Sequence, residues 1–162
     1  MLSNRGFTLI ELLVTVALIG IVSAIAIPSL AGSTARNSVW TASEQVGSQI
    51  RQARLKAISR NMSFRVKFDC PSTGQYRVLV VTGVAATDNA STRCSTTLNY
   101  DSGVFVMPKR VTYGTPPTLT VNPRGVYSST GGIPATITVT YDGSTSRTLT
   151  MSGTGQISFG VY

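Results

Sequence analysis

The side chains that could do chemistry in this chain are few and widely separated. The 162 residues contain no histidine, two cysteines and six acidic residues. Histidine is the usual general base in enzymes, and the acidic residues beyond Glu11 are scattered, with no pair at a spacing that suits acid–base work. No serine stands in the pattern of a nucleophile elbow, and no glycine-rich loop followed by lysine is present to cradle a phosphate. The sequence therefore predicts no enzyme, no cofactor and no metal site.

Cys70 and Cys94 are the residues best suited to covalent chemistry. Both lie outside the apolar N-terminal segment, and export would carry them into an oxidising compartment, where a disulfide is the default. A metal pair would need further ligands, and neither a histidine nor an acidic cluster is there to supply them. We therefore expect a disulfide between Cys70 and Cys94, worth roughly 3 kcal/mol on the chain-entropy model.

Glu11 stands inside a long apolar segment, where it is the only charged residue from Phe7 to Ile27. A helix over these residues would be about 30 Å long at 1.5 Å per residue, which matches the hydrocarbon core of a bilayer. Arg5 on the short N-terminal side places residues 1–6 in the cytoplasm by the positive-inside tendency. A carboxylate within such a segment costs about 2.5–3.5 kcal/mol, so its presence needs an explanation.

Three interpretations compete for the apolar segment, and Glu11 separates them. An ordinary signal peptide could be cleaved at the small residues of Ala24-Ile25-Ala26, whereas a plain membrane anchor would be retained whole. Neither of these gains anything from a carboxylate in the membrane. A filament subunit does gain from it, provided that the charge meets a partner when subunits pack together.

The run Arg5-Gly6-Phe7-Thr8-Leu9-Ile10-Glu11-Leu12-Leu13 resembles the prepilin signature of type IV pilins and type II secretion pseudopilins. The resemblance implies that a prepilin peptidase cleaves after Gly6 and methylates the new amine of Phe7. It also implies that Glu11 pairs with the Phe7 amine of a neighbouring subunit during assembly. Pro28 falls where the helices of this family often contain a loosening residue, and it would remove one backbone hydrogen bond and kink the helix.

Beyond the apolar segment the hydrophobic periodicity changes. Residues 29–60 carry one narrow apolar stripe at three- and four-residue steps, which predicts an amphipathic helix. The stripe consists of Val39, Ala42, Val46, Ile50, Ala53 and Ala57. Residues 61–162 then alternate with a period of two, which predicts antiparallel strands. The alternating runs lie at 64–68, 76–81, 137–141, 149–151 and 157–161, with an Asp142-Gly143 hairpin turn and loops at 83–103 and 123–134.

Four cations crowd the last turns of the predicted amphipathic helix, namely Arg51, Arg54, Lys56 and Arg60. Cations are favourable at a helix C-terminus because they offset its partial negative charge. This local explanation competes with a binding patch at the same place.

The fold class is therefore α+β and type IV pilin-like. One long N-terminal helix, with a membrane half and an amphipathic half, packs on an antiparallel β-sheet head. We divide the chain into a leader peptide at 1–6, a transmembrane and assembly helix at 7–28, and a periplasmic head at 29–162. Within the head, the amphipathic helix covers 29–60 and the β-rich part covers 61–162.

Two internal elements narrow the resemblance. The stretch from Gln52 to Asn61, which leads into a strand that ends at Cys70, resembles the GspH/FimT group of minor pilins and pseudopilins, and so does Asn122-Pro123-Arg124-Gly125. The resemblance implies a single-pass protein of the bacterial inner membrane that joins a type IV pilus or a type II secretion pseudopilus and helps to initiate or cap it. Its implied partners are other pilin or pseudopilin subunits, the prepilin peptidase and the inner-membrane assembly platform. Pilus and secretion machine share fold and signature, so both remain open.

The basic balance of the chain keeps a second function open. The formal net charge of +8 suits a nucleic acid, an anionic membrane surface or an acidic partner, but also a merely solvated surface. Lys109, Arg110, Arg124 and Arg147 could form the phosphate-binding face of a minor pilin that binds DNA for uptake in natural transformation. FimT-like competence proteins, which this chain resembles, contact DNA through a C-terminal Gly-Arg-x-Arg element. Here the matching stretch is Gly155-Gln156-Ile157-Ser158, without either arginine, so we favour structural assembly over DNA binding.

Overall fold

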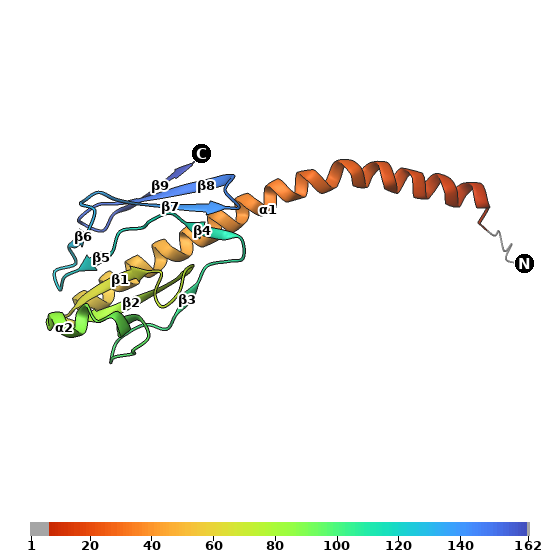
Figure 1. Ribbon diagram of the computed structural model, residues 1–162. Helices are drawn as coiled ribbons and strands as arrows, with labels where there is room; N and C mark the ends of the chain where they lie inside the picture. The colour runs from red at the N-terminus through yellow and green to blue at the C-terminus, as the bar shows by residue number, and fades with distance from the viewer. Residues whose placement is uncertain (1–6, 162) are drawn as a thin grey trace, which may run out of the picture. The chain divides into compact units, whose positions relative to one another are not determined.

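The computed structural model describes residues 7–161, and for residues 27–31 and 161 it describes the backbone alone. The chain divides into two compact units at the boundary between Arg36 and Asn37, and each unit is described by itself. A single helix, α1 (Leu9–Arg60), supplies the first unit and continues into the second (Figure 1). The predicted membrane and amphipathic halves thus form one helix of 52 residues.

The second half of α1 provides one wall of the core. All six residues of the predicted stripe are buried, so the prediction is confirmed. Val46 and Ile50 are the large members, and full burial of such side chains stabilises a fold by about 1.5–3 kcal/mol each. The alanines of the stripe have short side chains, so the sheets can approach α1 closely at these positions.

The helix ends at a local stop signal. Asn61 has a φ of +51°, a left-handed conformation that asparagine tolerates better than most residues. Its amide donates to the carbonyl of Ile58 at 3.4 Å, and the Met62 amide donates to that of Ala57 at 3.2 Å. These paired bonds satisfy the last free carbonyls of the helix and turn the chain toward the first strand.

Within the described residues, nine strands form two antiparallel sheets (Figure 1). The first has the order β3-β2-β1-β5-β6 and the second the order β4-β7-β8-β9. The strands of the first sheet are β1 (Ser63–Phe68), β2 (Gln75–Val81), β3 (Phe105–Val106), β5 (Leu119–Val121) and β6 (Tyr127–Ser129). Those of the second are β4 (Val111–Tyr113), β7 (Ala135–Tyr141), β8 (Thr145–Met151) and β9 (Ile157–Val161).

The predicted strands are confirmed at β1, β2, β7, β8 and β9. Strands β3 to β6 were not predicted, because two or three residues are too few to show a period. The stretch predicted as a loop at 83–103 contains two short helices, α2 (Ala85–Asp88) and the 3-10 helix η1 (Ser91–Cys94). Likewise β6 lies inside the predicted loop at 123–134.

Two glycines have roles that the structure makes plain. A Cβ on Gly47 would lie 3.2 Å from the ring of Phe159, so the glycine lets strand β9 close against α1. At the β7–β8 turn, Asp142 and Gly143 have φ values of +49° and +73°. Both are positive, as a type I′ hairpin turn requires, which confirms the turn predicted at this dipeptide.

The core lies between the second half of α1 and the two sheets. It contains Phe64 and Val66 from β1, Val139 from β7 and Leu149 from β8, all at most 1% exposed. The hydroxyl of the buried Tyr127 donates to a carbonyl of α1, that of Ile50. Helix and both sheets therefore share one hydrophobic core.

Candidate functional site

The start of α1 is fixed by Thr8, which precedes the first helical residue. Its side-chain oxygen accepts a hydrogen bond from the Glu11 amide at 3.3 Å, and its carbonyl accepts one from the Leu12 amide at 3.2 Å. Thr8 is thus an N-cap, and Glu11 lies in the first helical turn, where the helix dipole favours a negative charge. Within the described chain the Glu11 carboxylate has no hydrogen-bond or ion-pair partner.

The apolar half of α1 exposes nearly all of its large side chains. Residues Leu9–Ala26 have a mean hydropathy of 2.5, and none of them is buried. The exposed fractions of Phe7, Ile10 and Ile19 are 76%, 69% and 65%. This helix is long and apolar enough to cross a membrane. A contiguous apolar surface of this kind marks a segment that binds lipid or another protein.

Two of the predicted processing and assembly residues fall beyond what the structure describes. Gly6 and the rest of the leader lie outside the described residues, so cleavage after Gly6 stays a prediction. Pro28 lies within α1, which is helical on both sides of it, but its side chain is outside the description. The kink expected at Pro28 therefore also stays a prediction.

Cys70 and Cys94 form a disulfide, as predicted, with their Cα atoms 5.0 Å apart. Cys70 follows β1 and Cys94 ends η1, so the bond ties the β2–β3 connection to the first sheet. The buried Arg77 supports the same connection from β2. Its guanidinium donates to the carbonyls of Cys94 at 2.6 Å and Ser102 at 3.0 Å, and to the Thr97 hydroxyl at 3.0 Å.

A buried ion pair between Arg93 and Asp101 completes the connection. The two side chains are 3% and 0% exposed, and the shorter N–O distance is 2.7 Å. Burial alone would raise the pKa of Asp101. Hydrogen bonds from Arg93 and from the amides of Leu98 and Val80 outweigh it and hold that pKa below its ordinary value. The sequence does not predict this ion pair, because its two residues lie eight positions apart in a stretch without periodicity.

The four basic residues predicted as a phosphate-binding face do not share one surface. Arg110 forms an exposed ion pair with Asp142 at the β7–β8 turn, and Lys109 is exposed beside it. Arg124 is exposed in the β5–β6 turn, and the following residue, Gly125, contacts Arg54 near the end of α1. Lys109 and Arg110 therefore lie at one end of the head, and Arg124 lies at the other.

Arg147 does not belong to an exposed face, and this part of the prediction is corrected. Its guanidinium lies between the rings of Trp40 and Phe159, 3.8 and 4.2 Å from their centroids. It donates to the Ser43 hydroxyl at 2.8 Å and to Glu44 at 3.3 Å. The residue is 7% exposed because β8 turns it inward with Leu149 and Met151. The two rings and the burial leave little of this guanidinium for a phosphate to contact.

The Asn122–Gly125 turn, which carries part of the sequence resemblance, has a structural purpose. The Asn122 side chain accepts bonds from the amides of Arg124 and Val126, both at 3.0 Å. Gly125 has a φ of +76°, and a Cβ there would lie 2.9 Å from Nε of Arg54. That nitrogen donates to the Gly125 carbonyl at 3.0 Å. The turn thus fixes the first sheet to the end of α1.

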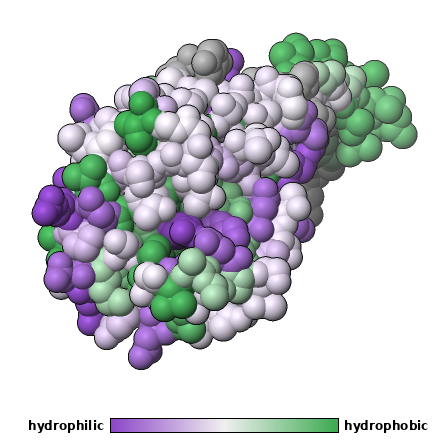
Figure 2. Space-filling model, turned by 60° about the vertical axis from the view of Figure 1, so that its left-hand side comes forward, coloured by the Kyte–Doolittle hydropathy of each residue, from purple (hydrophilic) through white to green (hydrophobic). Residues whose placement is uncertain are grey.

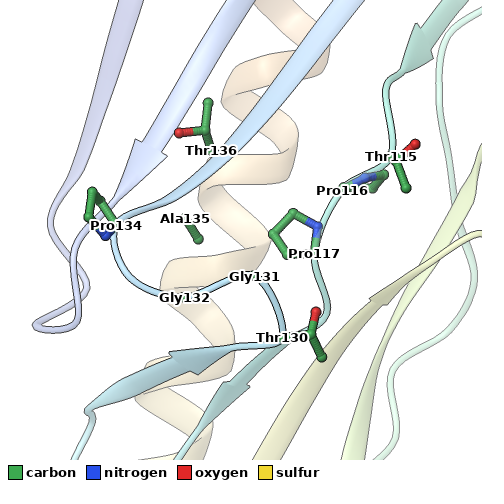
Figure 3. A pocket seen from close by; sticks show the side chains of 9 residues that line it. All are labelled: Thr115, Pro116, Pro117, Thr130, Gly131, Gly132, Pro134, Ala135 and Thr136. Atoms are coloured by element: carbon green, nitrogen blue, oxygen red, sulfur yellow. The ribbon is translucent and has the colours of Figure 1, made fainter.

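A cavity of about 490 Å³ opens between the β4–β5 connection and the start of β7. Figure 3 shows threonine and proline side chains around it, among them Thr115, Pro117, Thr130, Pro134 and Thr136. Its lining has no charged group, so it offers neither an acid–base pair nor an anion site. Among the residues that the structure describes, no cluster of histidine, cysteine and acidic side chains could hold a metal ion.

The head that carries these features matches a known family. The model described as "Type II transport protein GspH" matches residues 42–155, which is more than half of the chain. The chain belongs to the GspH family. A second model, "Prokaryotic N-terminal methylation motif", matches residues 1–27 and so covers the prepilin-like signature. Apolar helix and motif together indicate membrane anchoring for this GspH family member.

Among sequence relatives, a "Fimbrial protein" of Pseudomonas aeruginosa is 35% identical over 104 residues, which is 64% of this chain and 66% of that protein. Another "Fimbrial protein" of the same species is 41% identical over 78 residues, covering 48% of this chain and 49% of that protein. The chain thus spans about two thirds of one curated relative's length and about half of the other's.

Two solved structures share the fold. The type IV minor pilin FimU of Pseudomonas aeruginosa superposes with a TM-score of 0.54 at 16% identity, covering 77% of this chain and 90% of that one. The minor pseudopilin EpsH from the Type 2 Secretion System of Vibrio cholerae gives a TM-score of 0.54 at 15% identity, covering 76% and 97%. Family and fold are thus those of structural pilin subunits, and the pilin-like α+β architecture expected from the sequence is confirmed.

Proposed function

We propose that this GspH family member is a minor pilin or pseudopilin. It is a structural subunit that assembles through the first half of α1 into a type IV pilus or a type II secretion pseudopilus, and it helps to initiate or cap the filament. The observation that carries the proposal is the apolar half of α1, which is unburied over Leu9–Ala26 and lies within the matched methylation motif at residues 1–27. In a filament, neighbouring helices would cover this surface.

The proposal gives Glu11 a partner. Cleavage after Gly6 would make Phe7 the first residue and leave its amine about one helical turn before Glu11. Because the Glu11 carboxylate has no partner within the described chain, it is free to pair with the Phe7 amine of a neighbouring subunit. Such a charge-assisted bond would offset the cost of the carboxylate in the membrane.

The proposal also assigns a location and processing partners. Residues 1–6 would face the cytoplasm, where the prepilin peptidase acts, and the head would lie in the periplasm, where Cys70 and Cys94 can be oxidised. The assembly platform of the inner membrane would extract the processed subunit. We assign no catalytic step to this chain, because assembly requires only that it be processed and packed.

Processing is tested on the protein isolated from its native membrane. Intact mass and N-terminal sequencing should show a chain that begins at Phe7 and carries one methyl group on its amine. A mature chain beginning at Ile27 would instead establish the signal-peptide interpretation and overturn the proposal.

Assembly is tested with Glu11→Ala. Membrane insertion should be unchanged or easier, because a charge is removed from the apolar segment. Incorporation into sheared filaments should fall about tenfold or more, as the loss of a charge-assisted bond of 1.5–3 kcal/mol implies. Thr15→Ala, on the exposed surface of the same half-helix, is the control and should incorporate normally. Normal incorporation of Glu11→Ala at a normal protein level would refute the pairing.

A further inference from the structure

The C-terminal end of α1 presents a surface that the head itself does not use. We call this surface the α1-end patch and define it by Leu55, Lys56, Arg60 and Tyr100. Leu55 is aliphatic and yet 67% exposed. Figure 2 looks onto this end of the head, where apolar and strongly hydrophilic groups lie side by side.

The positive charge of the patch is uncompensated. Lys56 and Arg60 lie one helical turn apart, and neither has an acidic partner in the described part of the chain. No acidic residue occurs in the sequence between Glu44 and Asp69. The carboxylate of Asp101 lies nearby, but Arg93 already neutralises it.

Tyr100 shows that the patch is built rather than accidental. It occupies the third position of a turn that the Asp101 amide closes onto the Leu98 carbonyl at 3.1 Å. Its φ is +75°, a conformation in which such turns normally place glycine or asparagine. The turn holds the ring against Arg60, whose guanidinium carbon is 5.0 Å from the ring centroid. The favourable effect of cations on a helix dipole accounts for Lys56 and Arg60 but not for this tyrosine.

A cavity of about 220 Å³ opens between these side chains and is lined by Lys56, Arg60, Phe64, Tyr100 and Asp101. It is smaller than the pockets of roughly 300–1,000 Å³ that enclose small molecules. Its size suits a single side chain, and its two cations select a carboxylate. The neighbouring exposed Leu55 would gain from contact with a polypeptide, whereas a nucleic-acid backbone offers an aliphatic side chain nothing.

A second copy of this chain offers few uncommitted acidic groups, among its described residues, to fill the patch. Of the five acidic residues in the head, Asp88 and Asp101 are buried or engaged in hydrogen bonds with their own loop. Glu44 and Asp142 are paired with arginines. Asp69 remains, and its carboxylate accepts bonds from the Gly74 amide and the Tyr113 hydroxyl. With a formal net charge of +8, a second copy is a poorer complement to the patch than a different, more acidic chain.

We propose that the α1-end patch docks an acidic, partly apolar segment of a different pilin-type subunit, with one partner carboxylate seated between Lys56 and Arg60. This inference rests on the proposed function, because it names the chemistry of a neighbour in the filament. It also assigns the cations at the end of α1 to binding, one of the two explanations that the sequence left open.

The docking is tested by photo-crosslinking of the full-length chain in cells that carry the complete set of pilin-type subunits. A benzophenone side chain replaces Leu55 or, as the control, the exposed Thr112 of β4. We expect a specific adduct at Leu55 with a different pilin-type subunit, joined at a peptide that contains Asp or Glu, and no such adduct at Thr112. An adduct with a second copy of the chain or with nucleic acid, or equal labelling from both positions, would overturn the proposal.

Charge reversal then tests the carboxylate. Lys56→Glu should reduce the Leu55 adduct about tenfold, the loss expected for one charge-assisted bond. Lys109→Glu makes the same change of net charge on an exposed loop outside the patch and should leave the adduct intact. Replacement of the partner's acidic residue by lysine should restore the adduct of Lys56→Glu. Equal losses of the adduct in both variants would show that only net charge matters and would overturn the proposal. Failure of the partner's lysine to restore the adduct would also overturn it.

Two controls keep the outcomes distinct. Each variant is checked for an unchanged unfolding temperature, and Lys56→Gln replaces Lys56→Glu if the latter fails to fold. The unsubstituted chain is assayed in sheared filaments in the same cells. If it is absent from them, the proposed function fails. If it is present but shows no adduct through Leu55, the docking proposal fails alone.

Discussion

The two halves of α1 are both rich in apolar residues but complete their contacts in different ways. From Leu9 to Ala26 the mean hydropathy is 2.5 and no residue is buried. In the second half, Val39, Val46 and Ile50 are at most 2% exposed, because the two sheets of the head cover them. One continuous helix thus has a half whose apolar side chains are covered by its own chain and a half whose apolar side chains are exposed.

This difference separates stability from assembly. The second half contributes to a core whose strength can be measured on a single chain. The first half leaves a large apolar surface that only lipid or neighbouring subunits can cover. Substitutions in the second half should therefore change unfolding of the head, and substitutions in the first half should change only membrane insertion or assembly.

The sharpest test of the comparison is a matched pair of substitutions. Ile50→Ala removes a side chain that is 1% exposed and should lower the free energy of unfolding by about 4 kcal/mol, as large-to-small changes in a core do. Ile19→Ala makes the same chemical change at a side chain that is 65% exposed and should leave head unfolding unchanged. Both are measured on the full-length protein in detergent micelles by denaturant titration. Equal losses in the two variants would remove the distinction between the halves.

The disulfide should rank next. Replacement of Cys70 and Cys94 by serine, or reduction of the native protein, should lower the free energy of unfolding by about 3 kcal/mol on the chain-entropy model. Segment-resolved hydrogen exchange should show the loss in the head, with no change over Leu9–Ala26. Thiol titration of the unreduced, unfolded protein should find no free thiol, and two thiols would contradict the bond.

Arg147→Ala should have a smaller effect, a loss of about 2 kcal/mol, since it removes cation–π contacts and a charged hydrogen bond from a nearly buried site. Trp40, the single tryptophan of the chain, lies against the guanidinium, so its fluorescence spectrum should also change. Arg124→Ala, at an exposed arginine, is the control and should stay within about 0.5 kcal/mol of the unsubstituted protein. An unchanged spectrum in Arg147→Ala would contradict the stacked arrangement.

Arg147 also shows how far the sequence could lead. Its charge suggested an exposed residue, yet it stands in the apolar phase of the alternation that continues with Leu149 and Met151. That phase was visible in the sequence and was a signal that the side chain points inward. The missing information was the pair of rings that covers it, since Trp40 and Phe159 lie in distant parts of the chain.

Elsewhere in the molecule, the structure could be predicted where the sequence pattern is regular and could not be predicted where it is irregular. The buried stripe of α1 and the hairpin at Asp142-Gly143 follow repeating patterns and were predicted correctly. The disulfide followed from there being only two cysteines. The contacts that hold the β2–β3 connection were not predicted, because the bonds of Arg77 in β2 and the Arg93–Asp101 pair follow no sequence period and arise from tertiary contacts alone.

Acidification should have the smallest effect of these tests, because the loss of stability that it causes does not occur at neutral pH. Burial would raise the pKa of Asp88, but bonds from the Thr82 amide and hydroxyl and from the Gly83 amide outweigh it and lower that pKa. The pKa of Asp101 is lowered as well, chiefly by Arg93. A lowered pKa means that the folded head prefers the ionised form. Its contribution to stability is therefore complete above the unfolded-state pKa of about 4 and is lost as the pH falls through the folded-state value.

The unfolding free energy of the full-length protein in micelles should accordingly be flat from neutral pH down to about 5 and fall below about 4. Asp101→Asn should reduce that dependence, at the cost of lower stability at neutral pH, because Arg93 would be left buried without its counter-charge. Hydrogen exchange over Leu9–Ala26 should not follow the acid transition. If that segment loosened together with the head, the halves of α1 would be energetically coupled, and the separation of stability from assembly would be lost.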